Sequence, residues 1–257
     1  MKSVTVRGHF GEYVQGRLGL NGPLGLITVP CPKTGLEARL HCREAPKPGR
    51  LGVFLKALGI VGSREIVVSP LSPPGAGTGI STATLIAAAR LHGWDGPPEQ
   101  LMAACVAHEG ASDPLAFPHP ERLLWASREG RVLQEMPGLP PHDIVGAYFG
   151  VSRLTVPEDM DFADVSDLVQ DWEIARGLLT FGELASESAR RCLRRRGPAD
   201  DPTERLARSL GAMGFIIAHT GSARGLIFPK GEVPHDAASA LEAAGLAGVL
   251  QFGSDDC

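Results

Sequence analysis

Short stretches of alternating apolar and polar residues in the first quarter of the chain predict strands. In residues 3–9, valines alternate with Thr5 and Arg7, which is the period-two pattern of a strand with one buried face. Pro30 and Pro32 end a second stretch, because proline cannot donate a hydrogen bond to a sheet. The strands predicted in this region cover residues 3–9, 24–31, 36–43 and 65–69.

Apolar residues spaced three and four apart predict helices, and these become dominant after about residue 160. The predicted helices cover residues 50–60, 81–91, 98–109, 164–195, 202–212 and 235–244. Further strands are predicted over residues 122–125, 142–148, 215–219, 224–228 and 247–252, with a hairpin turn at Gly221 and Ser222. The class is mixed α and β, and the change of pattern places a domain boundary near residue 150.

Composition narrows the class of protein. The chain has 257 residues, 43% hydrophobic and 21% charged, with a formal net charge of −4. This balance is typical of a soluble globular protein and predicts no broad electrostatic surface for nucleic acid. No apolar stretch reaches the ~18–20 residues of a membrane span, and the N-terminus has no signal-peptide pattern. We therefore expect a cytoplasmic protein with a small-molecule partner, no nucleic-acid or membrane partner, and possible homodimers.

The five cysteines argue against a disulfide framework or a zinc site. Their number is odd, their spacing is wide and no C-x-x-C pattern occurs. A reducing compartment agrees best with this usage. The cysteines are Cys31, Cys42, Cys105, Cys192 and Cys257.

A glycine-rich loop carries the strongest local signal. Gly75, Gly77 and Gly79 alternate with other residues directly before a predicted helix that begins with Ser81 and Thr82. Glycines allow the backbone to approach an anion closely, and the N-terminus of a helix offers free N–H groups to phosphate. A hydroxyl at that position can also bind Mg²⁺.

Other interpretations of this loop are weaker. A P-loop requires a Gly-Lys pair before Ser or Thr, and this loop has no lysine. A dinucleotide fold requires glycines directly after a strand, whereas Pro73 and Pro74 intervene here and the third glycine is at the wrong spacing. A glycine-rich turn that only allows a helix to pack stays open when the loop is considered alone.

The segment from Pro73 to Ala83 resembles the phosphate loop of the galactokinase, homoserine, mevalonate and phosphomevalonate kinases (GHMP kinases). Their loop runs Pro-x-x-x-Gly-Leu-Gly-Ser-Ser-Ala-Ala, and this chain has Thr78 for Leu and Ile80 for the first Ser. Within that superfamily, the chain is most similar to the propanediol-utilisation-type L-threonine kinases of cobalamin synthesis. The matching blocks are Gly11-Glu12-Tyr13-Val14-Gln15-Gly16, Ser81-Thr82-Ala83, Glu109 with Asp113 and Phe117-Pro118, and Gly211-Ala212-Met213-Gly214 followed by His219-Thr220-Gly221 and Phe228-Pro229.

The resemblance implies an α+β, two-domain GHMP-kinase architecture. An N-terminal domain similar to domain 2 of ribosomal protein S5, residues 1–150, is expected to carry the phosphate loop and bind ATP. A ferredoxin-like C-terminal domain, residues 151–257, is expected to close the acceptor side. The implied reaction is ATP-dependent phosphorylation of a hydroxyl group, most simply that of L-threonine. Another small hydroxyl acceptor, a non-catalytic nucleotide-binding protein and, more weakly, a dinucleotide-dependent oxidoreductase are the alternatives.

The resemblance also assigns roles to single residues. Ser81 and Glu109 are expected to bind Mg²⁺, Ser81 and Asp113 to act in catalysis, and Glu12, Gln15 and Gly214 to lie near the acceptor. His9 and His219 are expected to be structural, with the side chain of His219 hydrogen-bonded in a strand. The residues expected to hold ATP are Pro74, Gly75, Ala76, Gly77, Thr78, Gly79, Ile80, Ser81 and Thr82.

Overall fold

A computed structural model describes residues 2–44, 49–61, 64–152 and 155–256. Its strands are β1 (Ser3–Arg17), β2 (Leu24–Glu44), β3 (Arg64–Pro70), β4 (Leu123–Ala126), β5 (Arg131–Glu135), β6 (His142–Tyr148), β7 (Gly214–Ile217), β8 (Ala223–Pro229) and β9 (Ala247–Gly253). Its α-helices are α1 (Arg50–Ala57), α2 (Ile80–Leu91), α3 (Pro98–Glu109), α4 (Ser166–Ile174), α5 (Leu178–Arg196), α6 (Thr203–Ser209) and α7 (Ala237–Ala243). A short 3-10 helix covers Pro120–Arg122.

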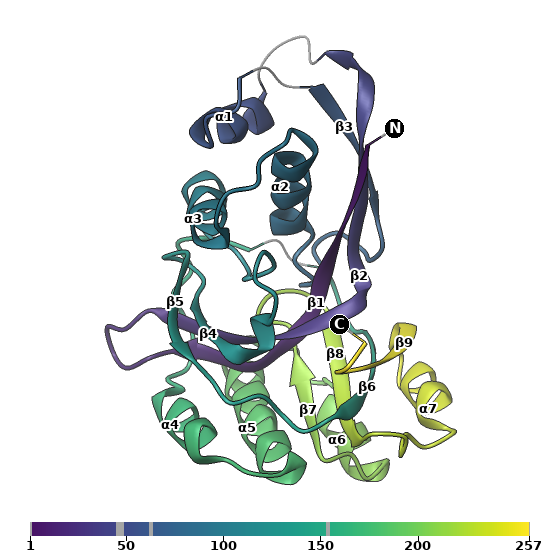
Figure 1. Cartoon of the computed structure of the whole chain (residues 1–257). Coiled ribbons are helices and arrows are strands. Elements are labelled where there is room, and N and C mark those ends of the chain that lie inside the picture. The colour runs from purple at the N-terminus through teal and green to yellow at the C-terminus, as the bar shows by residue number, and fades with distance from the viewer. Residues whose placement is uncertain (1, 45–48, 62–63, 153–154, 257) are drawn as a thin grey trace.

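The strands form one antiparallel sheet. Its order is β5-β4-β2-β1-β7-β8-β6-β9, and β3 pairs with the outer part of β2. Helices α1, α2 and α3 gather beside the upper part of β1 and β2, whereas α4, α5 and α6 lie below the sheet (Figure 1). The predicted α+β class is confirmed. The division near residue 150 stays a prediction, and β6, which precedes that boundary, pairs with β8 and β9 on its far side.

The two longest strands differ from the prediction. The strand predicted to end at residue 9 continues to Arg17, and the two strands predicted over 24–31 and 36–43 are one strand, β2. The separation at the prolines is wrong for two reasons: Pro30 pairs with His9 within the ladder, and Pro32 falls in a bulge, where Gly8 pairs with Cys31 but the preceding Arg7 pairs with Gly35. Three residues of β2 are thereby accommodated without ending the strand.

The long helix predicted over 164–195 is two helices. It breaks between α4 and α5, where Gly177 has φ +76°, a left-handed conformation that a helix interior cannot contain. Strand β5, which lies at the edge of the sheet, was not predicted. Its residues are only half-buried or exposed, so the sequence carries little apolar alternation there.

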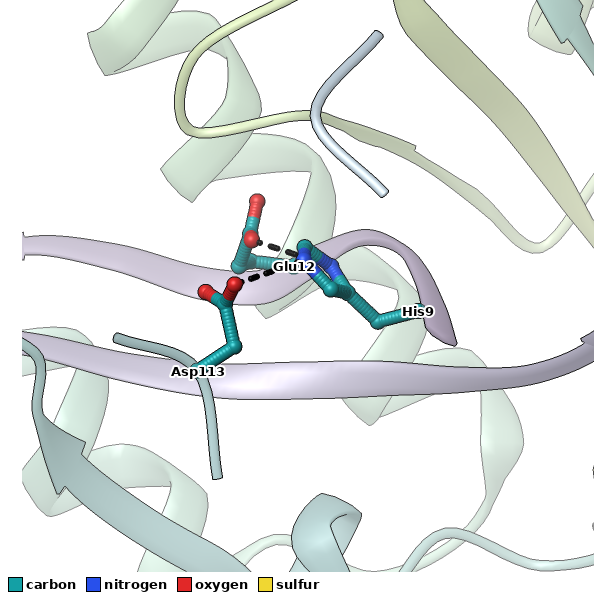
Figure 2. A group of neighbouring side chains, drawn as sticks. All are labelled: His9, Glu12 and Asp113. Atoms are coloured by element: carbon teal, nitrogen blue, oxygen red, sulfur yellow. Dashed lines mark ion pairs between the residues drawn. The ribbon is translucent and has the colours of Figure 1, made fainter. Parts of the chain in front are cut away.

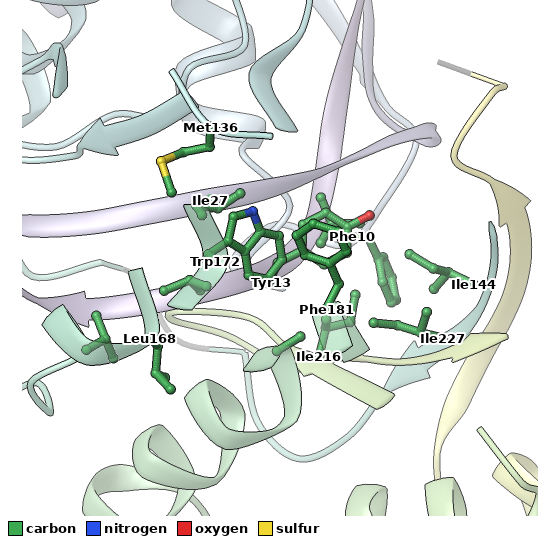
Figure 3. Close-up of a cluster of buried hydrophobic side chains, with 14 of the residues drawn as sticks. Phe10, Tyr13, Ile27, Met136, Ile144, Leu168, Trp172, Phe181, Ile216 and Ile227 are labelled. Carbon is green, nitrogen blue, oxygen red and sulfur yellow. The ribbon is translucent and has the colours of Figure 1, made fainter. Parts of the chain in front are cut away.

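Three apolar clusters hold the helices against the sheet. One joins β1 and β2 to α4 and α5, and its centre is Trp172, which packs edge-to-face against Phe181 with ring centroids 4.8 Å apart (Figure 3). The Trp172 indole N–H also donates to the Pro137 carbonyl at 3.1 Å. A buried side chain of this size contributes roughly 1.5–3 kcal/mol or more. A second cluster lies between β1, β2 and α1–α3, and a third between β6–β8 and α5–α7.

Within the described residues, the thiols of Cys31, Cys105 and Cys192 are buried and free. This agrees with the expectation of no disulfide framework for those three. Cys257 lies outside the described residues, and the side chain of Cys42 is likewise not described. In the same part of the chain, no helix has both the length and the apolar character needed to cross a membrane.

Candidate active site

The glycine-rich loop adopts a backbone that only glycines accept readily. Gly75, Gly77 and Gly79 have φ values of +75°, +77° and +73°, in the left-handed region that is costly for other residues. Space is also short, because a Cβ atom on Gly77 would lie 2.0 Å from the Thr220 carbonyl oxygen. The three glycines therefore fix both the shape of the loop and its close contact with residues 218–220.

The loop is held through its carbonyl groups, and its N–H groups remain available. The Ala76 carbonyl accepts hydrogen bonds from the N–H groups of Ser222 and Ala223, at 3.1 and 3.0 Å, and the Thr78 carbonyl accepts one from His9 at 3.3 Å. Among the described residues, the N–H groups of residues 77–82 have no protein acceptor, and no side chain caps α2. Free N–H groups at a helix N-terminus form a site for phosphate.

Ser81 and Glu109 are brought together by α2 and α3. Ser81 lies in the first turn of α2, and its hydroxyl donates a short hydrogen bond to Oε1 of Glu109, the last residue of α3. Burial raises the pKa of Glu109, and the Ser81 hydroxyl partly offsets this effect. A hydroxyl and a carboxylate beside a phosphate loop are oxygen ligands of the kind that Mg²⁺ prefers, so the residues present fit this ion.

Asp113 lies at the same place, on the loop after α3. Its backbone N–H donates to the Thr82 hydroxyl of α2 at 3.4 Å, which fixes the loop to the helix that follows the glycines. Its carboxylate is 22% exposed and lies 3.4 Å from Nε2 of His9. A carboxylate in this position can accept a proton from a hydroxyl that enters the cavity.

His9 lies between two carboxyl groups (Figure 2). Its Nδ1 is 3.4 Å from Oε1 of Glu12, and its Nε2 is 3.4 Å from Oδ2 of Asp113. The other Glu12 oxygen accepts a hydrogen bond of 2.6 Å from the His219 backbone N–H. Both oxygens of Glu12 are thus used inside the protein, although the residue borders the cavity where an acceptor would lie.

The buried charges shift one another's pKa values. Burial would lower the pKa of His9, but the nearby Asp113 and Glu12 outweigh it and raise that pKa to about 9. Burial raises the pKa of Glu12 to about 8, and His9 only partly opposes this. Burial would raise the pKa of Asp113, but His9 and Arg128 hold it below its usual range. Near neutral pH, the arrangement favours an imidazolium beside an ionised Asp113.

The group of His9, Glu12 and Asp113 also has the composition of a metal site, because its ligand atoms lie within 4.8 Å of one another. The two ion pairs between these residues account for their proximity without a metal ion. We therefore treat the group as an ion-pair cluster.

The loop, the Ser81–Glu109 pair and Asp113 border one cavity of about 330 Å³. Its remaining walls include residues of β1 and β2, Arg50 of α1, the segment after β4, Thr155 and the loop between β7 and β8. The predicted residues that line it are Glu12, Gly75, Gly77, Thr78, Gly79, Ile80, Ser81, Thr82, Glu109 and Asp113. A larger cavity of about 700 Å³ borders Tyr13 and His142, whose side chains hydrogen-bond to each other at 2.8 Å.

Four predicted residues do not line the smaller cavity. Ala76 is buried with its carbonyl bound to β8, and Pro74 is exposed at the outer side of the loop. Gln15 donates from its side chain to the Ile217 carbonyl at 3.0 Å. Gly214 packs against Gly182 of α5, where a Cβ would meet backbone at 2.3 Å. The structure therefore gives Gln15 a hydrogen bond to β7 and Gly214 a packing contact with α5, and we do not carry them into the proposed acceptor site.

Several residues that line the cavity were not among the predicted site residues. His9 was expected to be structural, but it contacts Asp113 directly. His219 was expected to have satisfied hydrogen bonds in a strand; this is wrong, because it follows the end of β7 and its two ring nitrogens have no partner among the described residues. Arg50 and Arg128 also line the cavity. The block His219-Thr220-Gly221 was a usable signal, but no local pattern singles out either arginine.

Comparison with known proteins identifies the fold. No protein-family model matches the sequence, and no curated protein matches it either. The mevalonate kinase of Methanococcus jannaschii matches with a TM-score of 0.64 and 9% identity, over 98% of this chain and 97% of that chain. A phosphotransferase described as related to the CoA biosynthesis pathway matches with a TM-score of 0.66 and 13% identity, over 98% and 97%. The homoserine kinase of Cytophaga hutchinsonii matches with a TM-score of 0.61 and 15% identity, over 98% and 95%.

The chain therefore has the fold of a class of small-molecule kinases. That fold is the GHMP-kinase fold, and it extends over nearly the whole chain. Identities of this size establish the fold alone, so the activity has to be argued from the cavity.

Proposed function

We propose that this protein is an ATP-dependent kinase that phosphorylates the hydroxyl group of a small molecule. The observation that carries the proposal is the hydrogen bond between the Asp113 N–H and the Thr82 hydroxyl. It places a carboxylate beside the helix whose free N–H groups suit phosphate. Positioning and charge neutralisation are the main requirements of phosphoryl transfer, and both are present around this one cavity.

Each residue has a defined task in this proposal. The N–H groups of residues 77–82 bind the ATP phosphates, and Asp113 accepts the proton of the acceptor hydroxyl. The hydroxyl oxygen forms a bond to the γ-phosphorus while the bond to the β,γ-bridging oxygen breaks, and ADP leaves. Ser81 and Glu109 would hold Mg²⁺, which neutralises charge on the phosphates. His9 keeps Asp113 ionised and therefore able to accept the proton.

The acceptor that we propose is L-threonine, giving O-phospho-L-threonine. Support comes from the sequence blocks that resemble L-threonine kinases, most of which border or adjoin the cavity. The fold does not select an acceptor, because matching structures are named for mevalonate and for homoserine. L-serine, L-homoserine and amino alcohols therefore belong in the same experiment.

The test is ADP release from MgATP by the purified protein. The panel contains L-threonine, L-serine, L-homoserine, 1-amino-2-propanol and a sample without acceptor. Asp113→Asn is expected to lower kcat by about 10²-fold or more, as for loss of a general base, with MgATP binding retained. Asp171→Asn, on an exposed face of α4, is the control and should behave as wild type. MgATP binding without acceptor-dependent ADP release would instead indicate a nucleotide-binding protein.

A further inference from the structure

The larger of the two cavities, of about 700 Å³, has no part in the proposed reaction. Its walls include the first half of β1, the last turn of α2, the segment from Leu115 to Arg122, the start of β6 and the end of β9. Its lining residues and those of the phosphate-loop cavity do not overlap. Its volume is in the range of pockets that hold nucleotide-sized or drug-sized molecules. The larger cavity is therefore a separate candidate for a ligand.

Strand β1 and the loop after α3 separate the two cavities. Gly8 borders the larger cavity, whereas the next residue, His9, borders the smaller one. Leu115 also borders the larger cavity, and its N–H donates to the Asp113 carbonyl at 2.8 Å. Its Cδ1 lies 2.8 Å from the position that a Cβ on Gly79 would take. The two cavities are thus neighbours, with the turn that carries Asp113 between them.

Three arginines border the larger cavity without a carboxylate partner. Arg7, Arg90 and Arg122 form no ion pair with any described residue, and the one side-chain hydrogen bond among them joins Arg7 to the Asp256 carbonyl at 3.0 Å. Nε of Arg122 lies 3.4 Å from the position of a Cβ on Gly138, which borders the same cavity. The charges of these arginines are therefore available to a ligand.

The carboxylates of this cavity are engaged with other side chains. Oε1 of Glu121 lies 3.4 Å from Nδ1 of His119, and Asp255 pairs with Lys230. Three arginines without acidic partners, against two carboxylates held elsewhere, leave the cavity with an excess of positive charge. Such a field favours an anion.

Arg90 is the most enclosed of the three arginines. It lies in the last turn of α2 and is half-buried, whereas Arg7 and Arg122 are exposed. Burial lowers the pKa of its guanidinium, and no carboxylate opposes this effect. Its nitrogens are not among the completely enclosed atoms that lack a partner, so the group reaches open space. A partly buried cation without a counter-charge is unfavourable, and an anion in the cavity would supply that charge.

We propose that the larger cavity binds an organic phosphate, with Arg90 and Arg122 contacting the phosphate group. Guanidinium binds phosphate oxygens in pairs, and a doubly charged phosphate matches several arginines better than a single carboxylate does. Apolar side chains offer a surface for the remainder of the molecule; they are Leu115, Phe117, Leu139 and Phe252. This site goes beyond the proposed kinase reaction and does not depend on it.

Calorimetric titration with 1-naphthyl phosphate tests the site. The comparison compounds are 1-naphthol, which lacks the anion, inorganic phosphate, which lacks the apolar body, and 1-naphthoate, which carries a carboxylate instead. We expect 1-naphthyl phosphate to bind about 10-fold more tightly than each of them, or better. Saturating MgADP should change its affinity by less than about twofold, because the two cavities share no lining residue.

Variants of the arginines locate the probe. Arg90→Gln should weaken its binding about 10-fold or more, Arg90→Lys should keep part of the affinity, and Arg122→Gln should weaken it several-fold. Arg39→Gln is the matched control, because Arg39 is an exposed arginine of β2 that does not border the cavity. It should bind the probe as wild type does. Thermal unfolding checks that each variant is folded.

The possible failures are distinguishable. Competition between the probe and MgADP would place the probe in the phosphate-loop cavity and overturn the second site, as would binding that is unchanged in both Arg90→Gln and Arg122→Gln. Equal binding of 1-naphthoate would overturn the assignment to phosphate. Arg90-dependent binding of the probe by a protein that does not bind MgADP would support this site and reject the kinase function.

Discussion

The imidazole Nε2 of His9 lies 3.4 Å from the Asp113 carboxylate, and this contact joins the first strand of the sheet to the loop after α3. On its other side, the ring contacts Glu12, which follows three residues later in β1, beyond an irregularity in the strand pairing. The contact determines the protonation state of the carboxylate proposed to activate the acceptor, since a neighbouring cation favours ionised Asp113. In the proposed mechanism, His9 is a positioning residue that acts through Asp113.

Replacing His9 is expected to move the acid limb of the pH–activity profile. Without the imidazolium, the pKa of Asp113 rises, because His9 is the strongest influence opposing its burial. In His9→Gln, the acid limb of kcat/KM should therefore shift to higher pH, by about one pH unit or more. Steady-state rates between pH 4 and 9 provide the measurement. An unchanged limb accompanied by a uniformly lower rate would show that His9 is only structural.

Removing the hydroxyl of Ser81 is expected to weaken the binding of Mg²⁺, so that more Mg²⁺ is needed for activity. The Ser81 oxygen and Glu109 are the two proposed protein ligands, and Mg²⁺ keeps several waters besides. In Ser81→Ala, the Mg²⁺ concentration for half-maximal activity should rise about 10-fold, whereas Ser81→Thr, which retains the hydroxyl, should change it little. Activity is titrated with Mg²⁺ at fixed ATP. An equal response of both variants would count against a role in metal binding.

An alanine at position 77 is expected to impair nucleotide binding. Its Cβ would lie 2.0 Å from the Thr220 carbonyl oxygen, so the loop must move. MgATP affinity should fall at least 10-fold in Gly77→Ala. Gly59→Ala is the matched control: Gly59 has φ +75°, but a Cβ there meets nothing within 4 Å. It should cost about 1 kcal/mol of stability, from backbone strain alone, and retain MgATP binding.

Stability is expected to fall as the pH rises from about 6.5 to 9, whereas below this range the lowered pKa of the buried His219 acts in the opposite direction. The pKa of Glu12 is raised from 4.5 to about 8, and that of His9 from 6.5 to about 9. The folded protein thus binds more protons than the unfolded chain, so the free energy of unfolding decreases with pH. Glu12 contributes fully to the free energy of unfolding below pH 4.5, and this contribution is lost as the pH rises through about 8. His9 contributes fully below pH 6.5, and its contribution is lost as the pH rises through about 9.

Glu12→Gln isolates the carboxyl contribution. It keeps an oxygen for the His219 N–H but cannot ionise, so it should be more stable than wild type at pH 9, by on the order of 2 kcal/mol. Urea unfolding at pH 5, 7 and 9 measures the difference, and the exposed Glu232→Gln serves as control. A pH dependence identical to that of wild type would contradict the assigned protonation of Glu12.

The sequence alone determined the features that depend on neighbours in the chain. The glycine loop, the start of α2 beside Ser81 and the α+β class all follow from local pattern, because glycine conformation and helix ends are set within a few residues. Most predicted strands and helices occur, with shifts at their ends. The same local reasoning separated the halves of β2 at Pro30, since it could not see the bulge opposite Arg7.

Only the tertiary structure decided which side chains share the cavity. Asp113 and His9 are more than a hundred residues apart, and their contact requires β1 and the loop after α3 to meet against α2. Gln15 and Glu12 lie in one sequence block, yet Gln15 bonds to β7 while Glu12 borders the cavity. Arg128 has no sequence signal at all. Packing of the sheet brings these distant groups together, and no local propensity encodes that proximity.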